Sequence, residues 1–123
     1  IMPVSGLSYI LSSIKDTIKE SHVDLKMALR AEEYTRILNL RKMERCKEYE
    51  EVVEEVLDKN DFTWKRLFGV EEKFNNCFND VEFVEKYVKG PKKKDLASLI
   101  TDLKLFHEDL RRKFRSGIKK EIC

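Results

Sequence analysis

The sequence predicts an all-α protein that folds as an antiparallel four-helix bundle, in one domain covering residues 1–123. Charged side chains make up 39% of the chain and apolar side chains 41%, and there are only four glycines and two prolines, a composition typical of charged helical proteins. Apolar residues recur at helical spacing in segments of about 25 residues. The expected helices cover residues 6–30, 32–58, 62–88 and 93–120.

The first two helices are separated by a change in the phase of the apolar pattern. The first apolar face consists of Leu7, Leu11, Ile14, Ile18, Leu25 and Leu29. Glu32, Glu33 and Arg36 then occupy the same face, so we expect a break near residues 30–33. A pattern similar to a capping box makes residues 20–23 a second place for the break. The alternative is three helices with one very long N-terminal helix that pairs as a coiled coil, possible only with a partner, and this predicts a dimer.

The second helix continues with apolar positions at Met43, Cys46, Tyr49, Val53 and Leu57. The third helix is expected to begin after the polar pair Asn60-Asp61. Its apolar face consists of Leu67, Val70, Phe74, Cys77, Phe78 and Val81. Phe83 and Tyr87 fall on the opposite side of this helix. They predict either a helix restart at Asn79-Asp80 or two exposed rings that contact a partner.

Gly90-Pro91 is expected to end the third helix, because glycine favours a helix C-terminus and proline cannot continue one. The last helix then has an apolar stripe about 120° wide, the usual width for a helix that faces a core. The stripe consists of Leu96, Leu99, Ile100, Leu103, Phe106, Leu110, Phe114 and Ile118.

The charges of the chain are divided between its two parts. Residues 1–88 hold 14 basic and 18 acidic side chains, whereas residues 89–123 hold 11 basic and five acidic ones. The basic C-terminal third is therefore a candidate surface for an anionic lipid or an acidic partner. The candidate anion- or lipid-binding residues are Lys92, Lys93, Lys94, Arg111, Arg112, Lys113 and Arg115. The acidic segment at residues 48–58 could instead pair with this basic helix inside the same bundle.

The cysteines and histidines show no catalytic or metal-binding pattern. Cys46, Cys77 and Cys123 are widely spaced and include no CxxC pair, so we expect reduced thiols and a cytoplasmic location. His107 lies at the edge of the last apolar stripe, where a partly buried histidine with satisfied hydrogen bonds is expected. No nucleophile motif, phosphate-binding loop or metal-ligand set is present. We therefore expect no enzymatic activity, no cofactor, no metal and no small-molecule substrate.

Two functional hypotheses follow. The first is a non-enzymatic helical module for protein–protein interaction, acting as an adaptor, a regulator or an oligomerisation domain, with Trp64, Phe83 and Tyr87 as candidate contact residues. The second is a peripheral domain that docks on an anionic membrane surface through its basic C-terminal third. Nucleic acid is not an expected partner, because the pI is about 8.4 and no motif that reads a groove is present.

The stretch FTWKRLF follows a glutamate-rich helix. Together with the general helical pattern, this arrangement resembles the N-terminal helical bundle domains of some cell-death pseudokinases and plant immune receptors. The resemblance implies membrane contact or self-association as the mode of action, and it assigns no role to a particular residue.

Overall fold

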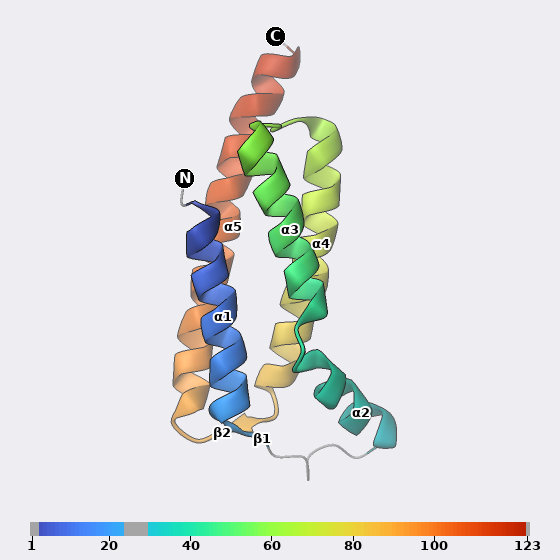
Figure 1. Cartoon of the computed structure of the whole chain (residues 1–123), viewed down its shortest axis with the longest axis vertical. Coiled ribbons are helices and arrows are strands. Elements are labelled where there is room, and N and C mark those ends of the chain that lie inside the picture. The colour runs from blue at the N-terminus through green and yellow to red at the C-terminus, as the bar shows by residue number, and fades with distance from the viewer. Residues whose placement is uncertain (1–2, 24–29, 123) are drawn as a thin grey trace.

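Over residues 3–23 and 30–122, the part of the chain that the computed structural model describes, four long antiparallel helices pack side by side (Figure 1). They are α1 (Val4–Glu20), α3 (Glu44–Lys59), α4 (Trp64–Glu85) and α5 (Lys92–Ile122). The predicted antiparallel four-helix bundle is confirmed.

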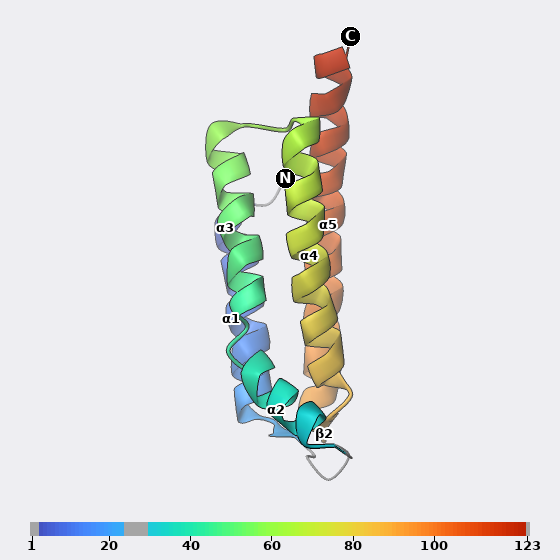
Figure 2. The same ribbon diagram turned by 90° about the vertical axis from the view of Figure 1, so that its right-hand side faces the viewer.

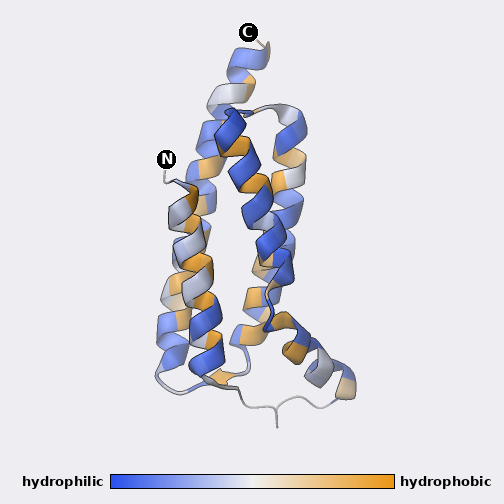
Figure 3. Cartoon of the chain, in the orientation of Figure 1, coloured by the Kyte–Doolittle hydropathy of each residue, from blue (hydrophilic) through white to orange (hydrophobic). Residues whose placement is uncertain are grey.

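Each long helix has two principal neighbours in the bundle. α1 packs against α3 and α5, and α4 packs against the same two helices, so α3 and α5 lie diagonally across the core (Figure 2). The ribbon of α3 is mostly hydrophilic with short hydrophobic bands, as expected for a helix with one buried face (Figure 3). The predicted apolar face of α5 is confirmed at six positions, which are fully or almost fully buried: Leu96, Ile100, Leu103, Phe106, Leu110 and Phe114.

The first helix is shorter than predicted. α1 ends at Glu20, and the next residues form the short strand β1 (His22–Val23), which pairs antiparallel with β2 (Val88–Lys89). This two-stranded sheet lies at the end of the bundle where the chain leaves α1 and α4 (Figure 1). The break predicted at residues 20–23 is therefore confirmed and the single very long helix is wrong, while residues 24–29 of the predicted helix 6–30 lie outside the described residues.

The predicted helix 32–58 is also wrong as a single element, because it is divided into α2 (Ala31–Leu40) and α3. Met43 breaks it, with a left-handed backbone at φ 51° that no helix interior permits, while its side chain stays buried in the core. α2 consequently turns away from the bundle axis and packs against α4 (Figure 1).

The boundaries of the last two helices agree with the sequence pattern to within three residues. α4 ends at Glu85 rather than near residue 88, since the chain there enters β2. Gly90 then adopts φ 87°, a conformation that glycine accepts without steric cost, and α5 begins directly after Pro91.

A disulfide bond joins α3 to α4 through Cys46 and Cys77, with an S–S distance of 2.04 Å. The expectation of reduced thiols is therefore wrong for this pair. Both residues were expected on buried faces, and both are buried. The spacing of apolar residues reveals which face of a helix is buried, but not the axial position of that helix relative to its neighbour. The antiparallel packing of α3 on α4 brings the two sulfur atoms together.

Reducing this disulfide should lower the stability of the protein substantially. The bond closes a loop across 31 residues of sequence separation, for which the loss of unfolded-state entropy gives a stabilisation of about 3–4 kcal/mol. We expect the melting temperature of a Cys123→Ser variant to fall by roughly 12–15 °C on addition of a reductant. Thermal unfolding followed by circular dichroism measures this change. A Cys46→Ser/Cys77→Ser variant should match the reduced protein, and an unchanged melting temperature would contradict the bond.

Gly117 permits the connection between α3 and α4 to lie against α5. A Cβ atom at this position would overlap the carbonyl oxygen of Phe62 and would lie only 2.6 Å from the Cβ of Phe62. Phe62 in turn packs edge-to-face on Phe114 at 5.3 Å between ring centroids. The close approach therefore requires a glycine inside a helix, where alanine would otherwise be preferred.

Two glycine-to-alanine substitutions should have opposite effects on stability. Gly117→Ala should lower the free energy of unfolding by about 1–3 kcal/mol, because the added methyl group displaces Phe62 from α5. Gly69→Ala is the matched control within α4, where nothing lies within 4 Å of the added atom, and it should raise the free energy by up to about 1 kcal/mol. Urea denaturation measures both values; a stabilising Gly117→Ala would refute the close contact.

Candidate functional site

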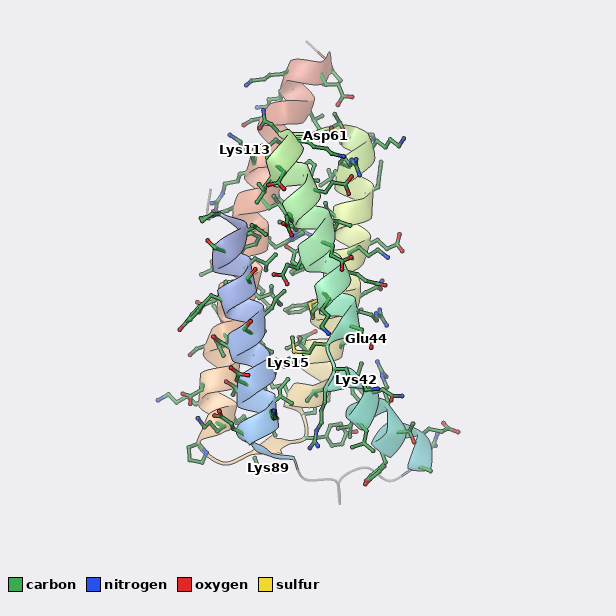
Figure 4. The ribbon with its side chains drawn as sticks, in the orientation of Figure 1. Lys15, Lys42, Glu44, Asp61, Lys89 and Lys113 are labelled. Carbon is green, nitrogen blue, oxygen red and sulfur yellow. A yellow bond between two sulfur atoms is a disulfide. The ribbon has the colours of Figure 1, made fainter. Side chains whose placement is uncertain are left out.

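A cleft of about 500 Å³ opens between the first turns of α4 and the last turns of α5. It lies toward the end of the bundle that Asp61 and Lys113 mark in Figure 4. Its volume is within the range of about 300–1,000 Å³ found for ligand pockets. The lining residues are Trp64, Leu67, Glu71, Arg111, Arg115, Ile118 and Lys119.

One wall of the cleft is aromatic. Trp64 is 54% exposed, and its neighbour Phe68, one helical turn further along α4, is 60% exposed. The two rings stand edge-to-face with 5.3 Å between centroids. The backbone N–H of Trp64 donates a hydrogen bond to Glu121 Oε2 at 3.2 Å, which ties the start of α4 to the end of α5. Trp64 is thus held at the cleft although its side chain is largely in solvent.

The other wall presents three cations at intervals of four residues, which places them on one side of α5. Arg111 is committed to Glu71, with hydrogen bonds of 2.9 Å from Nε and 2.6 Å from a terminal nitrogen, and this contact raises the pKa of Arg111. Arg115 and Lys119 form no ion pair with any residue that the structure describes. Their charges are therefore available to a ligand in the cleft.

Behind the cleft, a chain of buried hydrogen bonds connects three helices. Tyr49 Oη donates to His107 Nδ1 at 2.8 Å, and His107 Nε2 donates to Glu71 Oε1 at 2.8 Å. The imidazole also stacks on the ring of Phe74, with 3.7 Å between centroids and an interplanar angle of 3°. Both ring nitrogens are therefore satisfied by a neutral histidine with its proton on Nε2.

The ionisation states of Tyr49, His107 and Glu71 suit a structural role for these hydrogen bonds. Burial lowers the pKa of His107, although the neighbouring Glu71 acts in the opposite direction. The hydrogen bond from Arg111 lowers the pKa of Glu71, so its carboxylate stays charged. Burial, with a further effect of Glu71, raises the pKa of Tyr49. A buried tyrosine with a raised pKa is a poor nucleophile, so we interpret the chain as a support that positions Glu71 and Arg111 at the cleft.

Among the three predicted protein-binding residues, Trp64 lies in the cleft and the other two lie apart from it. Phe83 is half-buried beneath α2, where the guanidinium carbon of Arg36 lies 3.9 Å from the centre of its ring. Tyr87 is buried and donates a hydrogen bond from its hydroxyl to Glu33 Oε2 at 3.1 Å. The helix restart expected from the sequence does not occur, since α4 is continuous from Trp64 to Glu85. The pair of exposed rings does not occur either, because α2 covers both.

The predicted basic residues do not form one surface. Lys92, Lys93 and Lys94 lie in the first turn of α5, and Lys92 approaches Glu20 of α1 at 3.6 Å. The group from Arg111 to Arg115 lies about 30 Å further along the helix at 1.5 Å per residue. Of that group, Arg115 and Arg111 line the cleft, whereas Arg112 pairs with Asp109 and Lys113 lies 5.7 Å from the ring of Phe62.

The acidic segment of α3 pairs with α4 rather than with the basic helix. Glu55 accepts a hydrogen bond from Arg66 at 3.0 Å, and Glu48 lies 3.5 Å from Lys73. The ion pairs expected between this segment and α5 are not among those of the described residues. The diagonal positions of α3 and α5 explain the difference, since the outer faces of the two helices point away from each other.

Sequence reasoning missed Leu67, Glu71, Ile118 and Lys119 as residues of the site. A partial signal was present, because Trp64, Leu67 and Glu71 recur at helical spacing on α4. This signal was ambiguous, since the same spacing also describes a core face. The pairing of α4 with α5 decides that this stretch borders a cleft.

No family model, no curated protein and no solved structure matches the chain. Within residues 3–23 and 30–122, no helix combines the length and the apolar character needed to cross a bilayer. The same part of the chain contains no cluster of three or more histidine, cysteine, aspartate or glutamate side chains that could hold a metal ion.

The buried histidine should make the protein less stable in acid. Because the pKa of His107 is lower in the folded chain than its ordinary 6.5, the unfolded chain binds the proton first as the pH falls. The contribution of neutral His107 to the free energy of unfolding is complete above about pH 6.5 and is lost as the pH falls toward the pKa of the folded state. The free energy of unfolding then falls by at most about 1.4 kcal/mol per pH unit. His107→Gln should flatten this slope between about pH 7.5 and 5.5.

Urea denaturation across this pH range measures the slope. Asp102→Asn is the control, because Asp102 is an exposed acid in α5 that forms no ion pair with a described residue. It should keep the slope of the unmodified protein. Equal slopes for the protein and for His107→Gln would show that His107 is not the group that resists protonation.

Proposed function

We propose that this chain is a non-enzymatic interaction module that recognises another protein through the α4/α5 cleft and the adjoining rings of Trp64 and Phe68. The observation that supports the proposal most directly is the exposure of these two rings, which touch each other beside an apolar cleft. Tryptophan and arginine are the residues most enriched at the centres of protein interfaces, and the cleft contains both.

The cost of leaving these rings in water also supports a binding role. Other aromatic contacts of the described residues, such as Tyr49 with Phe74 and Phe62 with Phe114, lie within the core. Full burial of a large apolar side chain contributes about 1.5–3 kcal/mol, and Trp64 and Phe68, which are a little more than half exposed, would gain roughly half of this each if a partner covered them. An exposed apolar patch with a charged rim is a frequent mark of a protein-binding surface.

Docking on a membrane through the basic C-terminal third is the weaker hypothesis. It requires the lysines at the start of α5 and the arginines near its end to meet one flat surface. The stretch of α5 between them includes the exposed acid Glu108 and the exposed apolar residue Leu105. Electrostatic attraction to a bilayer decays within a Debye length of about 10 Å, so two separated groups gain less than one continuous patch.

The disulfide bears on the location in which the module acts. A buried bond between Cys46 and Cys77 is typical of proteins that fold in oxidising compartments, and disulfides of this kind are rare in the cytosol. We therefore propose an oxidising compartment in place of the cytoplasmic location expected from the sequence.

The proposal predicts that removal of the two rings abolishes partner capture. The oxidised protein, immobilised as bait, should enrich a partner from an extract of the source organism, and a Trp64→Ala/Phe68→Ala bait should lose it by at least tenfold. Truncation of two hot-spot residues usually costs about 2 kcal/mol or more of binding free energy. Quantitative mass spectrometry of the captured proteins measures the loss.

Tyr9→Ala is the matched control bait, because Tyr9 is 72% exposed on α1 and outside the cleft. It should capture the same partner as the unmodified protein. All baits should unfold at similar temperatures, since exposed rings contribute little to stability. If the double variant captures the same proteins in the same amounts, the cleft is not the interaction surface and the proposal fails.

A further inference from the structure

We infer that the occupant of the α4/α5 cleft is an acidic amphipathic helix of the partner protein. This inference rests on the proposed function and adds the chemistry of the docking segment: a row of apolar side chains on one face, with carboxylates along one flank. Three features of the cleft support it, namely its length, the distribution of its apolar residues and its charge.

The cleft has the length of two helical turns. Along α4 it extends from Trp64 to Glu71, seven residue steps, and along α5 from Arg111 to Lys119, eight residue steps. At 1.5 Å per residue both walls are about 10–12 Å long. Apolar residues at positions i, i+4 and i+7 of a docked helix span about 10.5 Å, so three successive anchors fit the cleft from end to end.

The apolar residues are placed on both walls. Trp64 and Leu67 contribute from α4, and Ile118 contributes from α5. Leu67 and Ile118 are half-buried, while Trp64 and the adjoining Phe68 extend the apolar surface into solvent. A helix laid between α4 and α5 would contact both walls with one apolar face, which is the usual geometry of recognition between a helix and a groove.

The charge of the cleft selects an acidic partner. Glu71 is the acid in its lining, and Arg111 and His107 already satisfy its carboxylate. Arg115 and Lys119 have no ion pair with a described residue, and both lie on the α5 wall. Carboxylates on one flank of the docked helix would pair with them. A basic helix would instead bring like charges together, which acts against binding.

A fluorescence titration tests the inference with synthetic peptides. The acidic probe is a 15-residue capped peptide that contains no aromatic residue, with leucine at positions i, i+4, i+7 and i+11, glutamate along one flank of this row, and alanine or glutamine at the other positions. The basic probe has lysine in place of every glutamate, and the polar probe has glutamine in place of every leucine. Trp64 is the only tryptophan of the chain, so its emission reports the cleft directly.

We expect the acidic probe to shift the emission of Trp64 to shorter wavelength and to saturate, with an affinity at least tenfold higher than that of either other probe. Its binding should weaken several-fold between about 50 and about 500 mM NaCl, because salt screens exposed charges. Equal affinity for the acidic and basic probes, or no response of Trp64 to any probe, would overturn the inference.

A pair of charge variants locates the interaction. Arg115→Gln/Lys119→Gln should bind the acidic probe roughly two- to thirty-fold more weakly, as expected for the loss of two exposed ion pairs. Lys93→Gln/Lys94→Gln removes the same charge from the far end of α5, at exposed residues that form no ion pair with a described residue, and should bind almost as the unmodified protein does. An equal loss in both variants would indicate attraction by net charge and would overturn the cleft assignment.

The outcomes separate this inference from the proposed function. If the acidic probe fails while the Trp64→Ala/Phe68→Ala bait still loses its partner, the interaction surface stands and the acidic helix is wrong. If that bait retains its partner, the proposal that the cleft is the interaction surface is wrong, whatever the titration shows.

Discussion

Burial of His107 between α3 and α4 is the constraint on which the arrangement of the bundle depends. Its two ring nitrogens must both find hydrogen-bond partners, because an unsatisfied polar group in a core costs about 1–3 kcal/mol. Tyr49 of α3 and Glu71 of α4 provide these partners at 2.8 Å each. A slide of one helix by a single turn would move a partner by about 5 Å and break the contact, so the histidine sets the level at which three helices meet.

The same contact extends outward to the surface. Glu71 accepts a hydrogen bond from His107 with one carboxylate oxygen and binds Arg111 with both. The series of buried hydrogen bonds therefore ends at the wall of the cleft. The disulfide of Cys46 with Cys77 holds α3 to α4 elsewhere along the same helix pair. With α3 and α4 bound together in this way, the position of α5 against α4 is determined by Arg111 and by the close contact of Gly117 with Phe62. The cleft is a consequence of these contacts rather than an independent feature.

The break between α2 and α3 decides which aromatic rings remain exposed. Because Met43 turns the chain, α2 leaves the bundle and covers Phe83 and Tyr87 with Arg36 and Glu33. No comparable element covers Trp64 and Phe68 at the other end of α4 in the part of the chain that the structure describes. The candidate interaction surface is thus confined to one end of one helix pair, beside Arg115 and Lys119 of α5.

The sequence by itself determined the fold class, the number of long helices, the buried face of each and the break at Gly90-Pro91. Helical spacing reports which side of a helix is apolar, and that information is local. It also singled out Trp64, Arg111 and Arg115, which lie in the cleft, but it grouped them with residues that lie elsewhere.

Only the tertiary structure decided which faces meet and at what level. The disulfide, the hydrogen bonds of His107 and the diagonal separation of acidic α3 from basic α5 all depend on the axial position of one helix against another. Apolar side chains do not specify that position, because burial is non-directional and tolerates a slide of one turn. Directional contacts between residues distant in sequence determine it, and they become visible only when the helices are packed.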